Sequence, residues 1–321
     1  MNVISDFKPQ TQIKGYYLVK NKQILKNKNG KDFVSLKVHD ATGNADAKIW
    51  ALHSGIAEFE SNDIVYIEGE LVLFQEHIQL NVFKLRNNVT DECDLSTLIP
   101  HTKKDVFKLE DKLFALIDEL QDEHLKKLLE GIFYNEATHK SFLLQSAGKS
   151  VHHAYLNGLL EHTISVTEIG KHLCGFYDNV NQEIVVAGCL LHDLGKLKEL
   201  SGFPTNDYTD EGQLLGHIVM GYEMVAIEIA KYPDFPTELA VILKHILVSH
   251  HGELEYGSPI RPKCIEAMIV HLADYTDSRI KMVEEFIDNS NESQYAGFHK
   301  LLNRNIRKTN YAGQQKTHIS E

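Results

Sequence analysis

Histidine and aspartate residues recur through the second half of this sequence in an arrangement that suits metal binding. The chain has 18 histidines, and one subset falls at intervals that place it on successive helices: His162, the pair His192 and Asp193, His217, the pair His250 and His251, and Asp274. Helical bundles build metal sites from inward-facing side chains on separate helices. A lone histidine is usually a packed or capping group, whereas a whole buried set without a metal would cost several kcal/mol. We therefore predict that this set converges on metal ions.

Apolar periodicity predicts the helices that must position these side chains. Apolar residues repeat at three- and four-residue spacing over residues 107–120, 125–133, 156–174 and 184–194. The ligand candidates are expected where such helices end or turn. His192 and Asp193 close the apolar run in CLLHDLGK, His217 follows Gly216, and Asp274 ends the run MIVHLAD. The second half of the chain is therefore predicted to be a helical bundle.

The first 88 residues show the period of strands instead. Inward Val34, Leu36 and Val38 alternate with polar neighbours, and a turn at DATG precedes a second alternating run at 45–49. An opening strand near 13–20, a short helix over 51–60 and two strands at 64–74 and 78–85 complete the pattern. This order is similar to that of the five-stranded OB barrel, whose exposed face and loops commonly bind oligonucleotides.

Aromatic and basic residues of the predicted barrel are candidates for contacts with a single strand. Residues 1–48 hold nine lysines against four aspartates, a local excess that would follow a phosphate backbone. The candidate contacts are Tyr16, Tyr17, Phe33, Lys37 and Trp50. Each aromatic residue taken alone is more often a core residue, and only a side chain on the open face of the barrel would count. Small barrels of this type also bind sugars or proteins, so the barrel leaves its ligand open.

Composition indicates the class of protein, and the predicted elements give the order of its domains. With 43% hydrophobic residues and a net charge of −12, the chain is expected to be a soluble, cytoplasmic protein without a membrane span. The predicted order is a multidomain chain: an all-β barrel over residues 1–88, a linker and lead-in helices over 89–140, an all-α metal-binding domain over 141–300 and a polar tail over 301–321.

The helical half resembles the HD superfamily of metal-dependent phosphohydrolases. The resemblance rests on the order His, His-Asp, His, His-His, Asp, on HDLGK with Lys196, and on the block HHAYLNGLLEHTISV. Together with a barrel in front, it looks like the YhaM-type 3′-5′ exoribonucleases of bacteria. The resemblance covers about Gly15 to Ile280 in outline, and its ligand spacing is specific within residues 150–275.

The resemblance also implies roles for the residues. His162, His192, Asp193 and Asp274 would hold one divalent ion, and Asp193, His217 and His250 the other, with His251 as an additional ligand. Asp193 would bridge the ions, which lie about 3.5–4 Å apart in two-metal sites. Lys196, one turn after His192 if the helix continues through Gly195, would contact phosphate. We expect Mn²⁺, with Co²⁺, Fe²⁺ and Zn²⁺ as alternatives.

The same resemblance separates this chain from a related branch that holds three metals. That branch would need a carboxylate at position 158, where this chain has glycine. His152, His153 and Tyr155 lie in the matching block and are expected to be structural or to line the pocket.

Three functions follow from these patterns. The first is a two-metal 3′-5′ exoribonuclease that degrades single-stranded RNA to nucleoside 5′-monophosphates, with single-stranded DNA left open as a further substrate. Its polarity comes from the resemblance alone. The second is a phosphodiesterase of small nucleotides or cyclic dinucleotides. The third is a non-catalytic nucleic-acid-binding protein. A homo-oligomer is also expected from the family resemblance.

Overall fold

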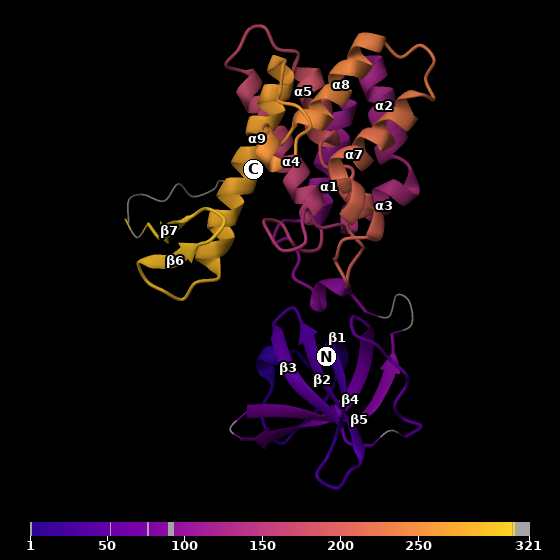
Figure 1. Cartoon of the computed structure of the whole chain (residues 1–321), viewed down its shortest axis with the longest axis vertical. Helices are drawn as coiled ribbons and strands as arrows, with labels where there is room; N and C mark the ends of the chain where they lie inside the picture. The colour runs from indigo at the N-terminus through magenta and orange to yellow at the C-terminus, as the bar shows by residue number, and fades with distance from the viewer. Residues whose placement is uncertain (1, 52, 76, 89–92, 310, 312–321) are drawn as a thin grey trace.

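The computed structural model contains an N-terminal β-barrel and a C-terminal helical domain, at opposite ends of the long axis (Figure 1). The structure describes residues 2–51, 53–75, 77–88, 93–309 and 311. Of the linker and lead-in helices predicted over 89–140, residues 89–92 lie outside this part. The described remainder begins with the short helix η2, Leu95–Thr97, and continues into α1.

The barrel closes in the order β1-β2-β3-β5-β4, which confirms the predicted OB topology. Its interior is filled by the alternating apolar residues of these strands, including Val34, Leu36 and Val38. The short helix η1, Ile4–Asp6, precedes the barrel. The strands are β1 Thr11–Lys26, β2 Asp32–Asp40, β3 Gly43–Ile49, β4 Ile64–Phe74 and β5 His77–Asn87.

The helix predicted over 51–60 is wrong for the described residues of that segment. Residues 51 and 53–60 contain no helix. The segment instead runs beside β5, because Ala57 N–H donates to the Leu85 carbonyl and Leu85 N–H donates to the Gly55 carbonyl. Phe59 is buried in the barrel core. Pairing with a neighbouring strand satisfied the backbone groups that a helix would have satisfied internally.

Nine helices cover the described part of the second half, which confirms the predicted bundle. Asp105, Asp122, Asn135 and Asn181 begin four of them by accepting hydrogen bonds from backbone N–H groups. The bounds are α1 Val106–Asp118, α2 Glu123–Phe133, α3 Glu136–Leu144, α4 Gly158–Cys174, α5 Gln182–Leu191, α6 Lys196–Glu199, α7 Asp210–Ile229, α8 Thr237–Ser249 and α9 Ile265–Asp288, with the short η3 Leu254–Tyr256 before α9.

Two glycines shape the backbone around the ligand candidates. Gly195 lies so close to α7 that a Cβ there would overlap the carbonyl oxygen of His217. Gly216 has φ +71° and kinks α7 directly before His217, a conformation that glycine adopts without steric cost. The turn after His192 and the kink in α7 therefore meet, which brings Asp193 and His217 together.

A β-hairpin follows the last helix. β6, Tyr295–His299, pairs with β7, Arg304–Arg307, and the hairpin lies beside the C-terminal half of α9 (Figure 1). The polar tail predicted from residue 301 is therefore wrong for residues 304–307, because Ile306 is buried and the strand pairs with β6. Residues 310 and 312–321 of that predicted tail lie outside the described part. No described helix is long and apolar enough to cross a membrane.

Candidate functional site

A first group of ligand atoms gathers between α4, the end of α5 and the middle of α9. His162 Nε2 lies 3.4 Å from Asp193 Oδ2 and 3.3 Å from Asp274 Oδ1. His192 Nε2 lies 3.2 Å from His162 Nε2 and 3.3 Å from Asp193 Oδ2. Ligand atoms about 2.0–2.2 Å from one ion lie about 2.8–3.6 Å from each other. His162, His192 and Asp193 therefore have the spacing of ligands to a single ion. Asp274 joins the group through His162 and lies 4.0 Å from His192 Nε2.

A second group forms around the other oxygen of the same aspartate. Asp193 Oδ1 lies 3.6 Å from His217 Nε2 and 3.8 Å from His250 Nε2. His251 Nε2 lies 3.2 Å from His217 Nε2, and the rings of His250 and His251 are in contact, with centroids 4.3 Å apart. Asp193 thus presents one oxygen to each group, as a bridging carboxylate would.

Hydrogen bonds on the far side of each ring direct the Nε2 lone pairs into the centre. In all five histidines Nδ1 contacts an acceptor, so Nδ1 carries the proton and Nε2 is left as a potential ligand. His250 Nε2 is buried and has no hydrogen-bond partner. The acceptors are the carbonyls of Cys189 for His192, Leu247 for His250 and Tyr256 for His251, and the carboxylates of Asp277 for His162 and Glu199 for His217.

The electrostatics of the centre also favour a cation. Burial, reinforced by His251 and His192, holds the pKa of His250 well below its ordinary value, so its imidazole is neutral. Burial opposes ionisation of Asp193, but Lys196 and His192 outweigh it and hold the pKa of this carboxyl well below its usual range. The neutral imidazole of His250 and the charged carboxylate of Asp193 are donors that a divalent ion would satisfy.

Lys196 reaches the centre by a different route from the predicted one. The sequence pattern placed it on the face of His192 in a continuous helix, but α5 ends at Leu191 and α6 begins at Lys196. The turn between the two helices packs against α7 at Gly195. Lys196 Nζ nevertheless lies 2.7 Å from Asp193 Oδ2 and also donates to the carbonyl of Ala147.

Two of the ligand candidates lie inside helices and not at helix ends. His162 is in the second turn of α4, and Asp274 is in the middle of α9. The other candidates lie where the sequence placed them, since His192 follows the last residue of α5 and His250 follows the last residue of α8. The structure brings all seven candidates together, and their roles as ligands remain predictions.

Sequence reasoning missed two carboxylates that hold the rings. Asp277 Oδ2 accepts from His162 Nδ1 at 2.7 Å and from His153 Nε2 at 2.9 Å. Glu199 Oε1 accepts from the backbone N–H and Nδ1 of His217, both at 2.9 Å. Asp277 lies one helical turn after Asp274, a spacing that could have indicated it. Glu199 lies in KLKEL, which carries no comparable signal.

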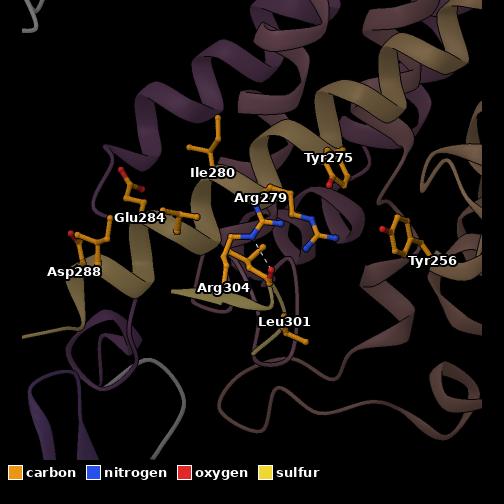
Figure 2. A pocket seen from close by; sticks show the side chains of 11 residues that line it. Tyr256, Tyr275, Arg279, Ile280, Glu284, Asp288, Leu301 and Arg304 are labelled. Atoms are coloured by element: carbon orange, nitrogen blue, oxygen red, sulfur yellow. Dashed lines mark hydrogen bonds between the residues drawn. The ribbon is translucent and has the colours of Figure 1, made fainter. Parts of the chain in front are cut away.

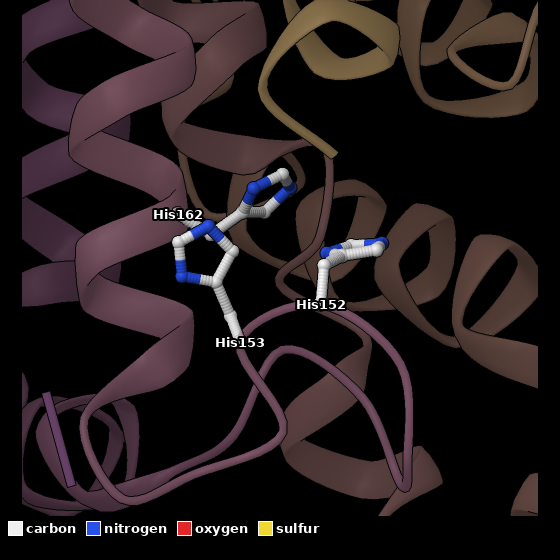
Figure 3. A group of neighbouring side chains, drawn as sticks. All are labelled: His152, His153 and His162. Carbon is white, nitrogen blue, oxygen red and sulfur yellow. The ribbon is translucent and has the colours of Figure 1, made fainter. Parts of the chain in front are cut away.

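A third cluster of nitrogens, drawn in Figure 3, lies beside the first group. Both ring nitrogens of His153 are hydrogen-bonded, Nε2 to Asp277 and Nδ1 to the Tyr155 hydroxyl. His153 therefore helps to hold Asp277 in place and has no nitrogen left for a metal. His152 lines the cavity over the centre, and burial lowers the pKa of His152 to about 3. A side chain at Gly158 would overlap the carbonyl of His153, so the carboxylate of the three-metal branch has no space here.

A cavity of 420 Å³ opens over the two groups. Asp193, Lys196, His251 and Asp274 are among its lining residues. Its volume falls within the range of about 300–1,000 Å³ that is usual for ligand sites. The ligand groups are therefore accessible to a substrate from this side.

The candidate contacts of the barrel do not share one surface. Tyr17 is 0% exposed and its hydroxyl donates to the carbonyl of Asn2, so the prediction that Tyr17 stacks on a base is wrong. Its position on β1 alternates into the core. Tyr16 lies on the outside of β1, edge-on to Tyr66 of β4.

Phe33 and Trp50 lie together on the outer face of β2 and β3, and Lys37 lies further along the same face of β2. Phe33 is buried beneath Trp50, on which it stacks with ring centroids 5.0 Å apart, whereas Trp50 is 46% exposed. Lys48 Nζ lies 5.1 Å from the Trp50 ring, and Lys37 is exposed on the same strand as Phe33. An exposed indole next to ammonium groups suits base stacking, so this patch is the candidate strand-binding surface.

Comparison with known proteins assigns the chain to a family. Residues 159–279 match the HD domain family. The 3′-5′ exoribonuclease YhaM of Shouchella clausii is 32% identical over 288 residues, covering 88% of this chain and 89% of that protein. The YhaM of Oceanobacillus iheyensis is 31% identical over 283 residues, covering 88% of each.

Among solved structures, the second OB-fold domain of replication protein A from Methanococcus maripaludis aligns with 29% of this chain and 98% of its own, at 18% identity and a TM-score of 0.23. The family assignment rests on the two YhaM relatives and on the HD match. The chain belongs to the YhaM family of HD-domain hydrolases.

Proposed function

We propose that this chain is a metal-dependent 3′-5′ exoribonuclease that degrades single-stranded RNA, with single-stranded DNA as a second substrate, to nucleoside 5′-monophosphates. The observation that carries the proposal is the placement of the two Asp193 oxygens, each facing its own group of ligand atoms beside Lys196. The names of the two relatives support RNA as the substrate and the 3′-to-5′ polarity.

The chemistry requires an activated water and charge neutralisation at phosphorus. Two divalent ions, when bound, make water a stronger nucleophile and neutralise the phosphoryl oxygens. Water adds to phosphorus and gives up one proton, the bond from phosphorus to O3′ of the preceding nucleotide breaks, and O3′ takes up one proton. Lys196, whose pKa is raised by Asp193 against the effect of burial, would donate to a phosphoryl oxygen as an ammonium group.

The identity of the ions is part of the proposal. A mixed set of imidazoles and carboxylates suits Mn²⁺, Fe²⁺, Co²⁺ and Zn²⁺, and we propose Mn²⁺ as the native pair. Metal analysis of protein purified without chelators would test this. One equivalent or less of any divalent ion per chain would count against two bound metals.

The barrel would capture the strand before hydrolysis. Trp50, stacked on Phe33, offers a platform beside Lys48, and Lys37 lies further along the same face of β2. Exposed rings with nearby positive charges are typical of surfaces that bind single strands without sequence preference. A homo-oligomer and a cytoplasmic location complete the proposal. Size-exclusion chromatography with light scattering and cell fractionation would test these two points.

One assay separates the proposed function from its alternatives. Purified protein with Mn²⁺ is incubated with single-stranded RNA labelled at the 5′ or the 3′ end, with the matching DNA and with cyclic dinucleotides. We expect a ladder of shortening 5′-labelled products and immediate release of a labelled mononucleotide from the 3′-labelled strand. Hydrolysis of cyclic dinucleotides alone would favour a small-molecule phosphodiesterase. Binding of RNA without hydrolysis would favour a non-catalytic protein.

A further inference from the structure

A second cavity continues the one over the ligand centre. It has a volume of 740 Å³ and lies between α9 and the β6–β7 hairpin. The two cavities share Tyr256, Tyr275, Arg279 and Leu301 as lining residues. They therefore form one path, which we call the α9–hairpin groove, from the centre along α9 to the hairpin.

Two guanidinium groups face this groove without acidic partners. Arg279 and Arg304 both line it, and Figure 2 shows their guanidinium groups in the middle of the pocket. Among the described residues, neither side chain forms an ion pair, and Arg304 Nε donates to the carbonyl of Leu302. The acidic residues at the other end of the groove are already paired, Glu284 with Lys281 and Asp288 with Lys103. The groove therefore offers two free positive charges to an anion.

Aromatic rings alternate with these charges. The Arg279 guanidinium carbon lies 5.0 Å from the ring centroid of Tyr275 and 6.0 Å from that of Tyr256. Tyr256 is 50% and Tyr275 is 42% exposed, so both rings present free faces. Exposed rings and unpaired guanidinium groups along a groove are the elements with which proteins bind single-stranded nucleic acid.

The hairpin forms a fixed outer wall of the groove. The His299 ring packs edge-on against Phe286 of α9, with centroids 4.9 Å apart. Lys308 Nζ donates to the carbonyl of Ser290, which follows α9. These contacts hold Leu301 and Arg304 opposite α9.

We propose that the α9–hairpin groove binds the nucleotides directly 5′ to the phosphodiester that is cleaved. Tyr256 and Tyr275 stack on bases, and Arg279 and Arg304 hold backbone phosphates. In 3′-to-5′ degradation the terminal nucleotide is released and the remaining strand extends 5′ from the reacting phosphate, so it needs a path away from the centre. The inference rests on the proposed function and names the residues that would hold the substrate of that same site.

A comparison of substrate lengths tests the groove. Arg304→Ala is compared with Arg307→Ala, an exposed arginine of the same strand outside the groove. Arg304 would hold a backbone phosphate that a dinucleotide lacks, so we expect kcat/KM on a decaribonucleotide, divided by kcat/KM on a dinucleotide, to fall about five- to tenfold in Arg304→Ala. The ratio should equal that of the wild type in Arg307→Ala. The slope of log KM against log salt should fall by about 0.7 when one phosphate contact is lost. A wild-type ratio in Arg304→Ala with correct folding by circular dichroism would overturn the inference.

A cross-linking experiment locates the strand without relying on turnover. Full-length protein in chelator is irradiated with RNA that carries 4-thiouridine at the second position from the 3′ end, and cross-linked peptides are identified by mass spectrometry. We expect the label on peptides containing Tyr256 or Tyr275. Labels confined to the barrel peptides would refute the groove.

The two experiments also separate the groove from the proposed function. Suppose that the RNA cross-links to the groove in chelator but that the protein shortens no RNA in the assay with Mn²⁺. That result would support the groove as a strand-binding site and refute the nuclease. Shortening of RNA with an unaltered length ratio in Arg304→Ala would refute the groove and leave the nuclease standing.

Discussion

The metal ligands of the helical domain and the strand contacts of the barrel were both predicted from residue types. The structure brings the first set of residues together but does not place the second set on one surface. In the helical domain all seven chosen residues meet. In the barrel Tyr17 lies in the core, Tyr16 lies with Tyr66 on β1 and β4, and Trp50 lies beside β2. Buried carboxylates and imidazoles are stable only with partners, so their type predicts that they meet. An aromatic ring is stable in a core or on a surface, so its type predicts neither.

The sharpest way to break this comparison is to remove the bridge between the two ligand groups. In Asp193→Asn one carboxylate oxygen becomes an NH₂ group, which cannot bind a cation. We expect RNA hydrolysis to fall at least about 10³-fold, with bound metal reduced and far-UV circular dichroism retained. Steady-state kinetics and metal analysis would check this against Asp178→Asn, which alters an exposed carboxylate. Turnover within tenfold of the wild type would mean that Asp193 is not the bridge.

Metal removal should affect the two regions unequally. An ion present at 100–1,000 times its Kd stabilises the domain that binds it by about 3–4 kcal/mol, and all the ligand candidates lie in the helical domain. The chain has one tryptophan, and it lies beside the barrel strands, so its fluorescence reports on the barrel while far-UV circular dichroism reports mainly on the helices. We expect chelator to lower the melting temperature seen by circular dichroism and to leave the fluorescence transition in place. Equal shifts in both signals would contradict a site confined to the helices.

The barrel half of the comparison is sharpened by Trp50→Ala. Loss of one stacking platform costs about 1–3 kcal/mol per base, so we expect the Kd for a single-stranded oligoribonucleotide to rise about 5- to 150-fold by fluorescence anisotropy. Phe176→Ala, an exposed aromatic residue of the helical domain, serves as the control and should bind as the wild type does. Unchanged affinity in Trp50→Ala would move the strand-binding surface elsewhere.

The smallest expected effect concerns a buried carboxylate that supports the ligand centre from behind. Glu161 accepts from Thr102 and Tyr155 and lies 3.4 Å from Lys104 and Lys281. Burial opposes its ionisation, but Thr102 and the nearby positive charges lower the pKa of Glu161 to about 2.

Because this pKa is depressed on folding, ionised Glu161 contributes stability above its unfolded pKa of about 4.3, and that contribution is lost as pH falls towards 2. Glu161→Gln should therefore be about 1–2 kcal/mol less stable at pH 7, and the gap should narrow below about pH 4.3. Urea unfolding followed at several pH values would check this. A gap that widens in acid would show that the carboxylate is not the stabilising form.

The sequence predicts secondary structure correctly where a segment shows a single clear hydrophobic periodicity. The strand at 64–74 and the alternating residues of 34–38 are where the sequence predicts them, because inward and outward positions differ in polarity. The segment 51–60 and the hairpin formed by residues 295–307 could not be predicted. Their backbone hydrogen bonds go to residues far along the chain, or to a strand too short to show a period.

The sequence by itself determined which residue types form the centre and that they meet, since a buried charge must find a partner wherever the chain places it. Only the tertiary structure decided which oxygen of Asp193 faces which histidine and that Asp277 and Glu199 hold the rings. It also decided that the centre opens into a groove walled by the hairpin. Those relations depend on the angles at which α4, α7 and α9 cross, and such angles are set by packing between segments distant in sequence.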